Sequence, residues 1–249
     1  MSPQPIQKGK TMNRKLFDLA NANQGKGAPL RAEVKDDVAT IYVYDVIDSY
    51  WGVSASDMAK TLAGITAPNI VVRINSPGGD VFEARAMMAQ LVGHPATVTA
   101  KIDGLAASAA SFLAMAASSV EIADGGFYMI HKGWTWMMGN ADDCRATAGL
   151  LDKVDASIIN TYAGKTGKSA DEIAAWMKAE TWFNAQEAID AGFCDSVIPT
   201  TASAKVDARA FNLAVFDKTP KALIAPEPIY IDDGVRDRQL ARLNLYERT

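Results

Sequence analysis

The chain has 249 residues, of which 49% are hydrophobic and 22% are charged, a composition typical of globular proteins. This length is enough for one domain with a large buried core or for two small domains. The formal net charge of −4 gives no overall basic field, so nucleic acid is not an expected partner. The two cysteines, Cys144 and Cys194, are too few for a disulfide framework and form no CxxC pair for zinc. No metal or cofactor is implied.

Both ends of the chain differ in composition from its middle. Residues 1–33 are rich in Gln, Asn, Gly and Lys without periodicity, which predicts a flexible N-terminal arm. They contain no apolar stretch like that of a signal peptide, and residues 104–117 fall short of the ~20 residues that cross a bilayer. We therefore expect a cytoplasmic protein without a membrane partner. Residues 34–200 are predicted to form the folded domain, and residues 201–249 a C-terminal extension with a short helix or interaction tail near residues 235–248.

Between these ends, β-branched and apolar runs alternate with amphipathic stretches. The runs predict strands at residues 38–44, 69–74, 97–102, 120–122 and 127–130. The amphipathic or small-residue stretches predict helices at residues 54–65, 81–92, 104–117, 142–162, 169–178 and 185–191. Because strand, crossover helix and strand repeat along residues 38–130, the sequence predicts an α/β fold with right-handed crossovers.

Three motifs in this region could carry chemistry. Residues 75–79, Asn-Ser-Pro-Gly-Gly, follow an apolar strand, and their glycines permit backbone conformations that let a ligand approach main-chain N–H groups. Ser108 lies among alanines at the start of a predicted helix, where backbone N–H groups favour a developing oxyanion. His131 ends an apolar strand, the position at which α/β folds place functional groups.

Each motif alone also has an ordinary structural interpretation. The glycine turn could simply join a strand to a helix, the small-residue helix around Ser108 could pack on a sheet, and His131 could be a structural histidine. The other histidine, His94, lies in a predicted loop and is given no role. Together the three supply a nucleophile, a base and paired N–H donors, which are the parts that acyl transfer requires.

The motifs INSPGG, GLAASAASF and YMIHK, in this order, resemble those of the Clp proteolytic subunit family of serine peptidases. The resemblance covers about residues 35–198 and includes the later stretches at residues 180–188 and 191–195. It implies the Clp and crotonase-like fold, an α/β superhelix of repeated ββα units. It also implies that Ser108 is the nucleophile, that His131 is its general base, and that the N–H groups of Gly79 and Ala109 form the oxyanion hole.

The chain departs from the family at the third position of the catalytic triad. The family usually has Asp two residues before an aromatic residue, and the ungapped match places Glu180 there, two residues before Trp182. A glutamate keeps the negative charge that orients the imidazole and stabilises the imidazolium. A solvated charge at a helix end is the alternative interpretation of Glu180, and Asp152 and Asp155 are the other candidate acids.

The pattern Glu180-Thr-Trp182 resembles the Clp-like head maturation proteases of tailed phages and prophages. That resemblance implies cleavage of capsid scaffold or portal-associated proteins during prohead assembly, and a homo-oligomeric ring. No match to the surface that docks a Clp ATPase is found, so an unfoldase partner is not expected. The apolar residues 133–139 would suit a subunit interface or, alternatively, a substrate-binding flap.

The sequence is also compatible with three alternatives. A signal-peptide-peptidase-type enzyme would use a Ser/Lys dyad, for which Lys132 or Lys165 could serve. A crotonase-like acyl-CoA enzyme would share the fold and the paired N–H donors but would not need both Ser108 and His131. A catalytically inactive assembly protein could keep the ring fold, and the unusual acid at residue 180 makes this worth testing.

Overall fold

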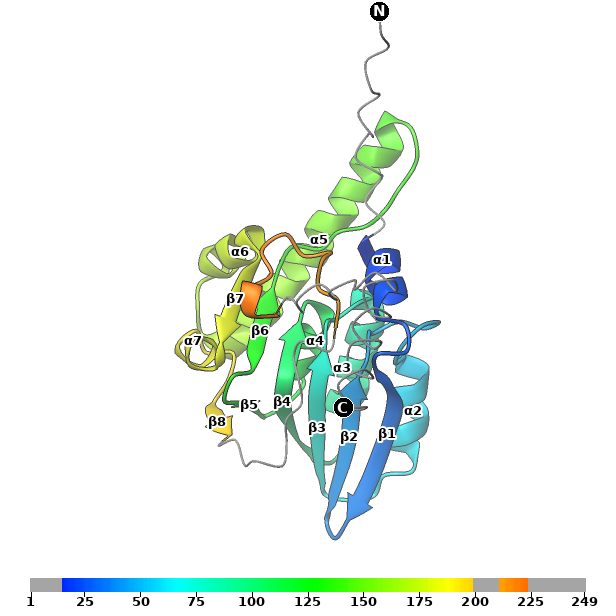
Figure 1. Ribbon diagram of the computed structural model, residues 1–249, viewed down its shortest axis with the longest axis vertical. Helices are drawn as coiled ribbons and strands as arrows, with labels where there is room; N and C mark the ends of the chain where they lie inside the picture. Colours follow the sequence, from blue (N-terminus) through cyan, green and yellow to red (C-terminus); the bar gives the residue numbers. More distant parts are fainter. Residues whose placement is uncertain (1–14, 199–210, 224–249) are drawn as a thin grey trace, which may run out of the picture.

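The computed structural model describes residues 15–198 and 211–223, which form one mixed sheet with helices packed on it (Figure 1). The described part contains an eight-stranded sheet in which the strands follow the order β1-β2-β3-β4-β5-β8, and β6 pairs with both β4 and β7. The strands are β1 (Ala28–Lys35), β2 (Val38–Tyr44), β3 (Asn69–Ser76), β4 (Thr97–Ala107), β5 (Ser119–Ala123), β6 (Phe127–Ile130), β7 (Thr181–Asn184) and β8 (Ser196–Ile198).

Most helices lie between these strands in the chain, whereas α1 precedes β1 and η2 follows β8. They are α1 (Lys15–Asn23), α2 (Ala55–Ala63), α3 (Val81–Gly93), α4 (Ala109–Ala114), α5 (Ala141–Thr166), α6 (Ala170–Ala179), α7 (Ala185–Asp190) and the 3-10 helix η2 (Lys221–Leu223). Asp80 caps α3 by accepting from two N–H groups of its first turn, and Asn140 caps α5 in a capping box. In Figure 1, α5 extends well past the edge of the sheet.

The strands from β2 to β5, together with β8, run parallel, and this sets where their ends meet. β2, β3 and β4 pair in parallel register, β6 runs parallel to β4, and only the β1–β2 and β6–β7 pairs of the described sheet are antiparallel. The expected α/β class is therefore confirmed. Because the carboxyl ends of parallel strands meet at one edge, the residues that follow β3, β4 and β6 lie close together.

On the edge opposite β3, the strand β4 pairs with two different neighbours along its length. Its first half pairs with β5, from Thr99 opposite Ser119 to Ile102 opposite Ile122, and its second half pairs with β6, with Leu105 opposite Phe127. This extension of β4 to Ala107 corrects the prediction of a helix over residues 104–117. Residues 104–107 stay extended because they pair with β6, so the helix begins only at Ala109.

The prediction of a flexible arm over residues 1–33 is wrong where the structure describes it. Residues 15–23 form α1, in which Leu19 and Ala20 are 1% exposed, and β1 forms a hairpin with β2. A mostly exposed strand such as β1 lacks the alternation that identifies a half-buried strand, which explains why its sequence gave no signal. Residues 1–14 of the arm lie outside the described part.

Part of the expected C-terminal extension also packs on the domain. Residues 211–223 contribute Phe211, Leu213, Phe216 and Leu223 to a buried cluster. The other members of this cluster come from α1, β4 and β6, together with Val46, two residues after the end of β2. The side chain of Asn23, in α1, bonds both the backbone N and the carbonyl oxygen of Asn212. The expected helix or tail near residues 235–248 lies outside the described residues.

In the part that is described, no helix is both long and apolar enough to cross a bilayer.

Candidate active site

The turn between β4 and α4 holds Ser108 in a strained backbone conformation. Ser108 has φ 53° and ψ −123°, a region that residues other than glycine rarely adopt. Its N–H donates to the carbonyl oxygen of Met129 in β6 at 2.9 Å, and its carbonyl oxygen accepts from the N–H of Ser111 at 3.0 Å. The turn therefore projects the Ser108 hydroxyl from a backbone that is fixed on both sides.

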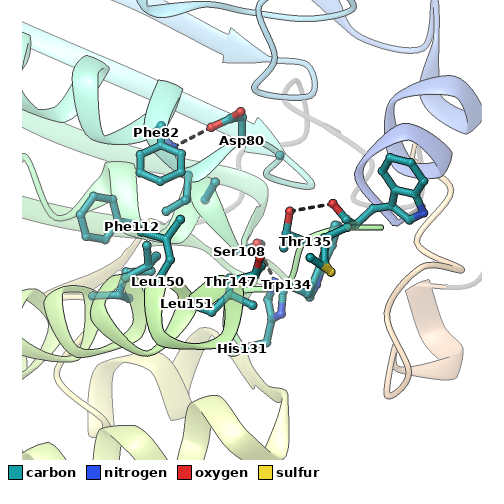
Figure 2. A pocket seen from close by; sticks show the side chains of 18 of the residues that line it. Asp80, Phe82, Ser108, Phe112, His131, Trp134, Thr135, Thr147, Leu150 and Leu151 are labelled. Atoms are coloured by element: carbon teal, nitrogen blue, oxygen red, sulfur yellow. Dashed lines mark hydrogen bonds between the residues drawn. The ribbon is translucent and has the colours of Figure 1, made fainter. Parts of the chain in front are cut away.

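His131 follows β6 and meets this hydroxyl. The distance between Ser108 Oγ and His131 Nε2 is 2.7 Å, a hydrogen bond shown as a dashed line in Figure 2. The rings of Trp134 and Phe216 both lie beside the imidazole, with centroid distances of 5.8 Å and 5.5 Å. A serine hydroxyl in hydrogen-bond contact with an imidazole is the geometry in which the imidazole can remove the hydroxyl proton.

The glycine turn after β3 packs directly on the Ser108 turn. A Cβ on Gly78, whose φ is 86°, would lie 2.4 Å from the Ala107 carbonyl oxygen, and a Cβ on Gly79 would lie 2.1 Å from that of Ile47. The bridge to Ile47 uses the Gly78 carbonyl and the Asp80 N–H, so the Gly79 N–H takes no part in it. The Ala109 N–H is the first of α4 and has no partner within that helix. Gly79 and Ala109 both line the same cavity as Ser108.

A buried chain of hydroxyl groups supports the carbonyl side of the turn. Ser111 Oγ donates to the Ser108 carbonyl oxygen at 2.6 Å and lies 2.8 Å from the hydroxyl of Tyr162. Tyr128 Oη donates to the Ser111 carbonyl oxygen at 2.5 Å. Burial raises the pKa of both tyrosines above the ordinary value, so both hydroxyls remain protonated donors.

The cavity beside Ser108 is mainly apolar. It has a volume of about 360 Å³, and its walls come from the start of α3, from α4, from residues 133–137 and from α5 (Figure 2). Apolar side chains that line it include Phe112, Leu151, Val154 and Ile158. The participation of residues 133–137 agrees with the flap interpretation of that stretch, and the structure of one chain leaves the interface interpretation as a prediction.

Glu180 lies near His131, but its carboxylate points elsewhere. The antiparallel register pairs Ile130 with Thr181, so His131 and Glu180 are one step beyond the last ladder pair. Glu180 Oε2 accepts from the N–H of Asp217 at 3.0 Å, and Oε1 accepts from the N–H of Lys218 at 2.6 Å. Among the hydrogen bonds of the described residues, none joins Glu180 to His131.

Of the other candidates from the sequence, Asp155, Lys132 and Lys165 contact groups other than His131 and Ser108, whereas Asp152 is exposed. Asp155 is buried and accepts from the Gly133 N–H at 2.7 Å, with Lys132 Nζ 3.4 Å from its second oxygen. Asp152 is exposed on α5. Lys165 Nζ lies 3.2 Å from the Ser118 carbonyl oxygen.

Within residues 15–198 and 211–223, no cluster of three or more His, Cys, Asp or Glu side chains is arranged to hold a metal ion. Cys144 is exposed and Cys194 is buried, and both are free thiols.

The fold and the site together define a class of protein. A serine at a strained strand-to-helix turn, bonded to a strand-end histidine beside an apolar cavity, is the arrangement of a serine hydrolase. A family model described as Clp protease matches residues 39–201. The chain therefore belongs to the Clp protease family of serine peptidases.

Individual relatives agree with this assignment. The chain is 33% identical over 170 residues to the ATP-dependent Clp protease proteolytic subunit 1 of Protochlamydia amoebophila, covering 65% of this chain and 81% of the relative. It is 28% identical over 176 residues to subunit 2 of Mycolicibacterium paratuberculosis, covering 70% and 82%. A third similar protein is the proteolytic subunit of Bacteroides fragilis, 30% identical over 132 residues, which cover 52% of this chain and 64% of that relative.

Two features of the site were not predicted from the sequence. Ser111 and Tyr162 support the Ser108 turn, and only the short spacing of Ser111 from Ser108 could have suggested the first of them. Phe216 contacts His131 from a segment that was assigned to the C-terminal extension. Nothing local in the sequence marks that contact, because 85 residues separate its partners.

Proposed function

We propose that this protein hydrolyses peptide bonds with Ser108 as the nucleophile and His131 as the general base. The 2.7 Å contact between Ser108 Oγ and His131 Nε2 carries the proposal. In the first step the imidazole takes the hydroxyl proton while Oγ attacks the peptide carbonyl carbon, and the protonated imidazole then gives that proton to the leaving amine. A water molecule, deprotonated by the imidazole, then attacks the acyl carbon; the bond from that carbon to Oγ breaks, the imidazolium returns the proton to Oγ, and the peptide fragment leaves as a carboxylic acid.

The N–H groups of Gly79 and Ala109 are proposed to stabilise the oxyanion. Both residues border the cavity that contains Ser108, and neither N–H is used by the bridge or the helix that holds its residue. Paired donors of this kind stabilise charge that develops only in the transition state, and one such donor contributes roughly 10²–10³ in kcat.

Glu180 is proposed as the acidic member of the site because it is one ladder step from His131. Its carboxylate bonds the amides of residues 217 and 218 in this structure. In this arrangement Glu180 therefore acts on the imidazole through its negative charge and through the position of residues 217 and 218, whose amides it binds.

The positions of the lysines favour His131 over a lysine base. Lys132 Nζ lies 3.4 Å from the Asp155 carboxylate, and Lys165 bonds carbonyl oxygens that precede β5. A general base must lie within hydrogen-bond reach of the proton that it removes, and His131 Nε2 lies 2.7 Å from Ser108 Oγ.

In biological terms, we propose a prohead maturation protease that cuts capsid scaffold or portal-associated proteins as a homo-oligomeric ring in the host cytoplasm. The Glu180-Thr-Trp182 pattern and the packed segment beyond the family-matched residues support this proposal over a housekeeping role. The relatives are named as ATP-dependent proteolytic subunits, so an ATPase-coupled protease is the second candidate.

A fluorophosphonate probe tests the catalytic assignment. We expect an adduct on Ser108, located by mass spectrometry, that is lost in His131→Ala and in Ser108→Ala. An unlabelled protein would instead indicate an inactive assembly protein or a crotonase-like enzyme. Labelling that survives in His131→Ala but is lost in Lys132→Ala would indicate a Ser/Lys dyad.

Particle assembly tests the biological role. We expect capsid assembled with Ser108→Ala to retain full-length scaffold or portal-associated protein, whereas the unmodified protease yields new N-termini in them. Cleavage of a folded protein that requires ATP and a Clp ATPase, with no change in capsid proteins, would favour the second candidate.

A further inference from the structure

An aromatic residue from beyond the family-matched part of the chain contacts the catalytic imidazole. The rings of His131 and Phe216 are 5.5 Å apart with an interplanar angle of 69°, an edge-to-face arrangement. Phe216 is 5% exposed, whereas the family match ends at residue 201. The surroundings of the proposed base therefore include a side chain that the family pattern does not supply.

The segment that carries Phe216 is anchored at several points. Its start is tied to α1 through the two bonds between Asn23 and Asn212. Within it, the Phe216 N–H donates to the Leu213 carbonyl oxygen at 3.0 Å, and Thr219 Oγ1 donates to the same oxygen at 2.9 Å. The ring of Phe216 packs edge-to-face on that of Trp182, with a centroid distance of 5.8 Å.

Glu180 holds the backbone directly after Phe216. Its two carboxylate oxygens accept from the N–H groups of Asp217 and Lys218, and the Lys218 side chain donates to the Ala179 carbonyl oxygen. Glu180 has φ 50°, a left-handed conformation at the end of α6. Hydrogen bonds to a charged carboxylate are about twice as strong as neutral ones, so this contact fixes the position of Phe216.

We infer that Phe216 is a positioning residue for His131, and that Glu180 acts on the imidazole by holding Phe216 in place. This inference rests on the proposed function, because it takes His131 as the base. The cavity lining, as far as the described residues form it, includes His131 and Trp134 but not Phe216. Loss of the Phe216 ring should therefore affect the orientation of the base more than the binding of substrate.

The substitution Phe216→Ala tests this role by separating kcat from KM. We expect kcat and the second-order rate of fluorophosphonate labelling to fall roughly tenfold to a hundredfold, the loss that a displacement of about 1 Å can cause. KM should change less than threefold, and Phe216→Tyr, which keeps the ring, should restore most of the rate. The matched control is Phe211→Ala, which removes an equally buried ring at the other end of the segment.

Position 180 distinguishes this role from that of a direct triad acid. If Glu180 orients the imidazole itself, Glu180→Asp supplies the family's usual acid and should keep the rate, while Glu180→Gln should lose about 10⁴ in kcat. If Glu180 acts through Phe216, the shorter Asp cannot reach both amides and should lower the rate as Phe216→Ala does. Glu180→Gln keeps one acceptor oxygen and should then lose less than Glu180→Asp.

The double variant Glu180→Asp/Phe216→Ala completes the test. Residues that act through one path are non-additive, so the double variant should be no slower than Phe216→Ala alone. Additive losses, or a Phe216→Ala variant that labels at the unmodified rate, would overturn the inference. If thermal unfolding shows that Phe216→Ala does not fold, Phe216→Leu replaces it in the test, because leucine keeps the apolar volume but has no ring. Absence of Ser108 labelling in the unmodified protein would instead reject the proposed function.

Discussion

The side chain of Ser111 donates a hydrogen bond to the carbonyl oxygen of Ser108 at 2.6 Å, from a position that is 0% exposed. Because a serine hydroxyl has one proton, the 2.8 Å contact between Ser111 Oγ and Tyr162 must use the tyrosine proton. A directed chain of hydrogen bonds therefore runs from α5 through α4 to the strained turn that carries the proposed nucleophile, Ser108. This chain of hydrogen bonds stabilises the carbonyl group of Ser108, whose backbone conformation, with φ 53°, is otherwise unfavourable.

Replacement of Ser111 tests this chain. We expect Ser111→Ala to lose about 1–3 kcal/mol of unfolding free energy, because the Tyr162 hydroxyl keeps no acceptor at that point. The rate of fluorophosphonate labelling at Ser108 should fall about tenfold, since the turn loses one support. Chemical denaturation and labelling kinetics measure the two effects.

The double variant Ser111→Ala/Tyr162→Phe separates stability from catalysis. Removal of both polar partners is nearly neutral for stability, so most of the unfolding free energy should return. The labelling defect should persist, because the Ser108 carbonyl still lacks its hydroxyl donor. Recovery of both properties would show that Ser111 matters only for packing.

The apolar cavity predicts the preference of the peptidase. Phe112, Leu151 and Val154 line the space beside Ser108, so a buried apolar side chain on the acyl side of the cut bond should fit there. Burial of a leucine side chain contributes about 1.5–3 kcal/mol, which corresponds to roughly tenfold to a hundredfold in kcat/KM. Peptides that differ only by Leu or Glu at that position measure the preference, and equal rates would contradict this use of the cavity.

The turn after β3 predicts a sharp contrast between two glycines. Gly79→Ala should lose activity and about 1–3 kcal/mol of stability, because its φ of 150° disfavours a side chain and its Cβ would lie 2.1 Å from the Ile47 carbonyl oxygen. Gly93→Ala is the matched control at the far end of α3, where a Cβ would meet nothing within 4 Å. It should be neutral or slightly stabilising, and thermal unfolding with labelling kinetics compares the two.

Alkaline pH should destabilise the fold. Burial raises the pKa of Tyr128 and Tyr162 above the ordinary 10.0 and raises the pKa of the Cys194 thiol to about 12. Above pH 9 to 10 the unfolded chain loses protons that the folded chain keeps, so the unfolding free energy falls as pH rises. Each such group contributes a slope of up to about 1.4 kcal/mol per pH unit.

Tyr162→Phe provides the comparison for that slope. The variant lacks one of the groups with a raised pKa, so its unfolding free energy should fall less steeply between about pH 10 and pH 11. Denaturation at several pH values gives both slopes. Identical slopes would show that Tyr162 ionises equally in the folded and unfolded chains.

Where local pattern determines structure, the sequence allows good predictions. The strands at residues 38–44 and 127–130 form with those bounds, because their β-branched and aromatic side chains pack into the core. The contact between Ser108 and His131 joins the two residues that the motifs single out. The helix predicted from residue 104 fails at its start because pairing with β6 outweighs the helix propensity of alanine.

Contacts between distant segments account for what the sequence did not predict. The alignment of Glu180 places it one ladder step from His131, but the direction of its carboxylate depends on amides 37 and 38 residues later. The turn of residues 213–219 that presents those amides has no periodic signal. Its aromatic residue is buried only because α1, β4 and β6 together provide the surface that receives it.

The bond between the Glu180 carboxylate and the backbone of residues 217 and 218 links two parts of the chain that family comparison treats separately. A relative that lacks residues 217 and 218 has no amide groups there for a glutamate carboxylate to bind. An aspartate at the position of residue 180 then loses no such contact. Acid length at residue 180 and the presence of the segment should therefore vary together during evolution. If Phe216 positions His131 as inferred, the functional boundary of the peptidase extends at least to residue 218, beyond the family-matched residues 39–201.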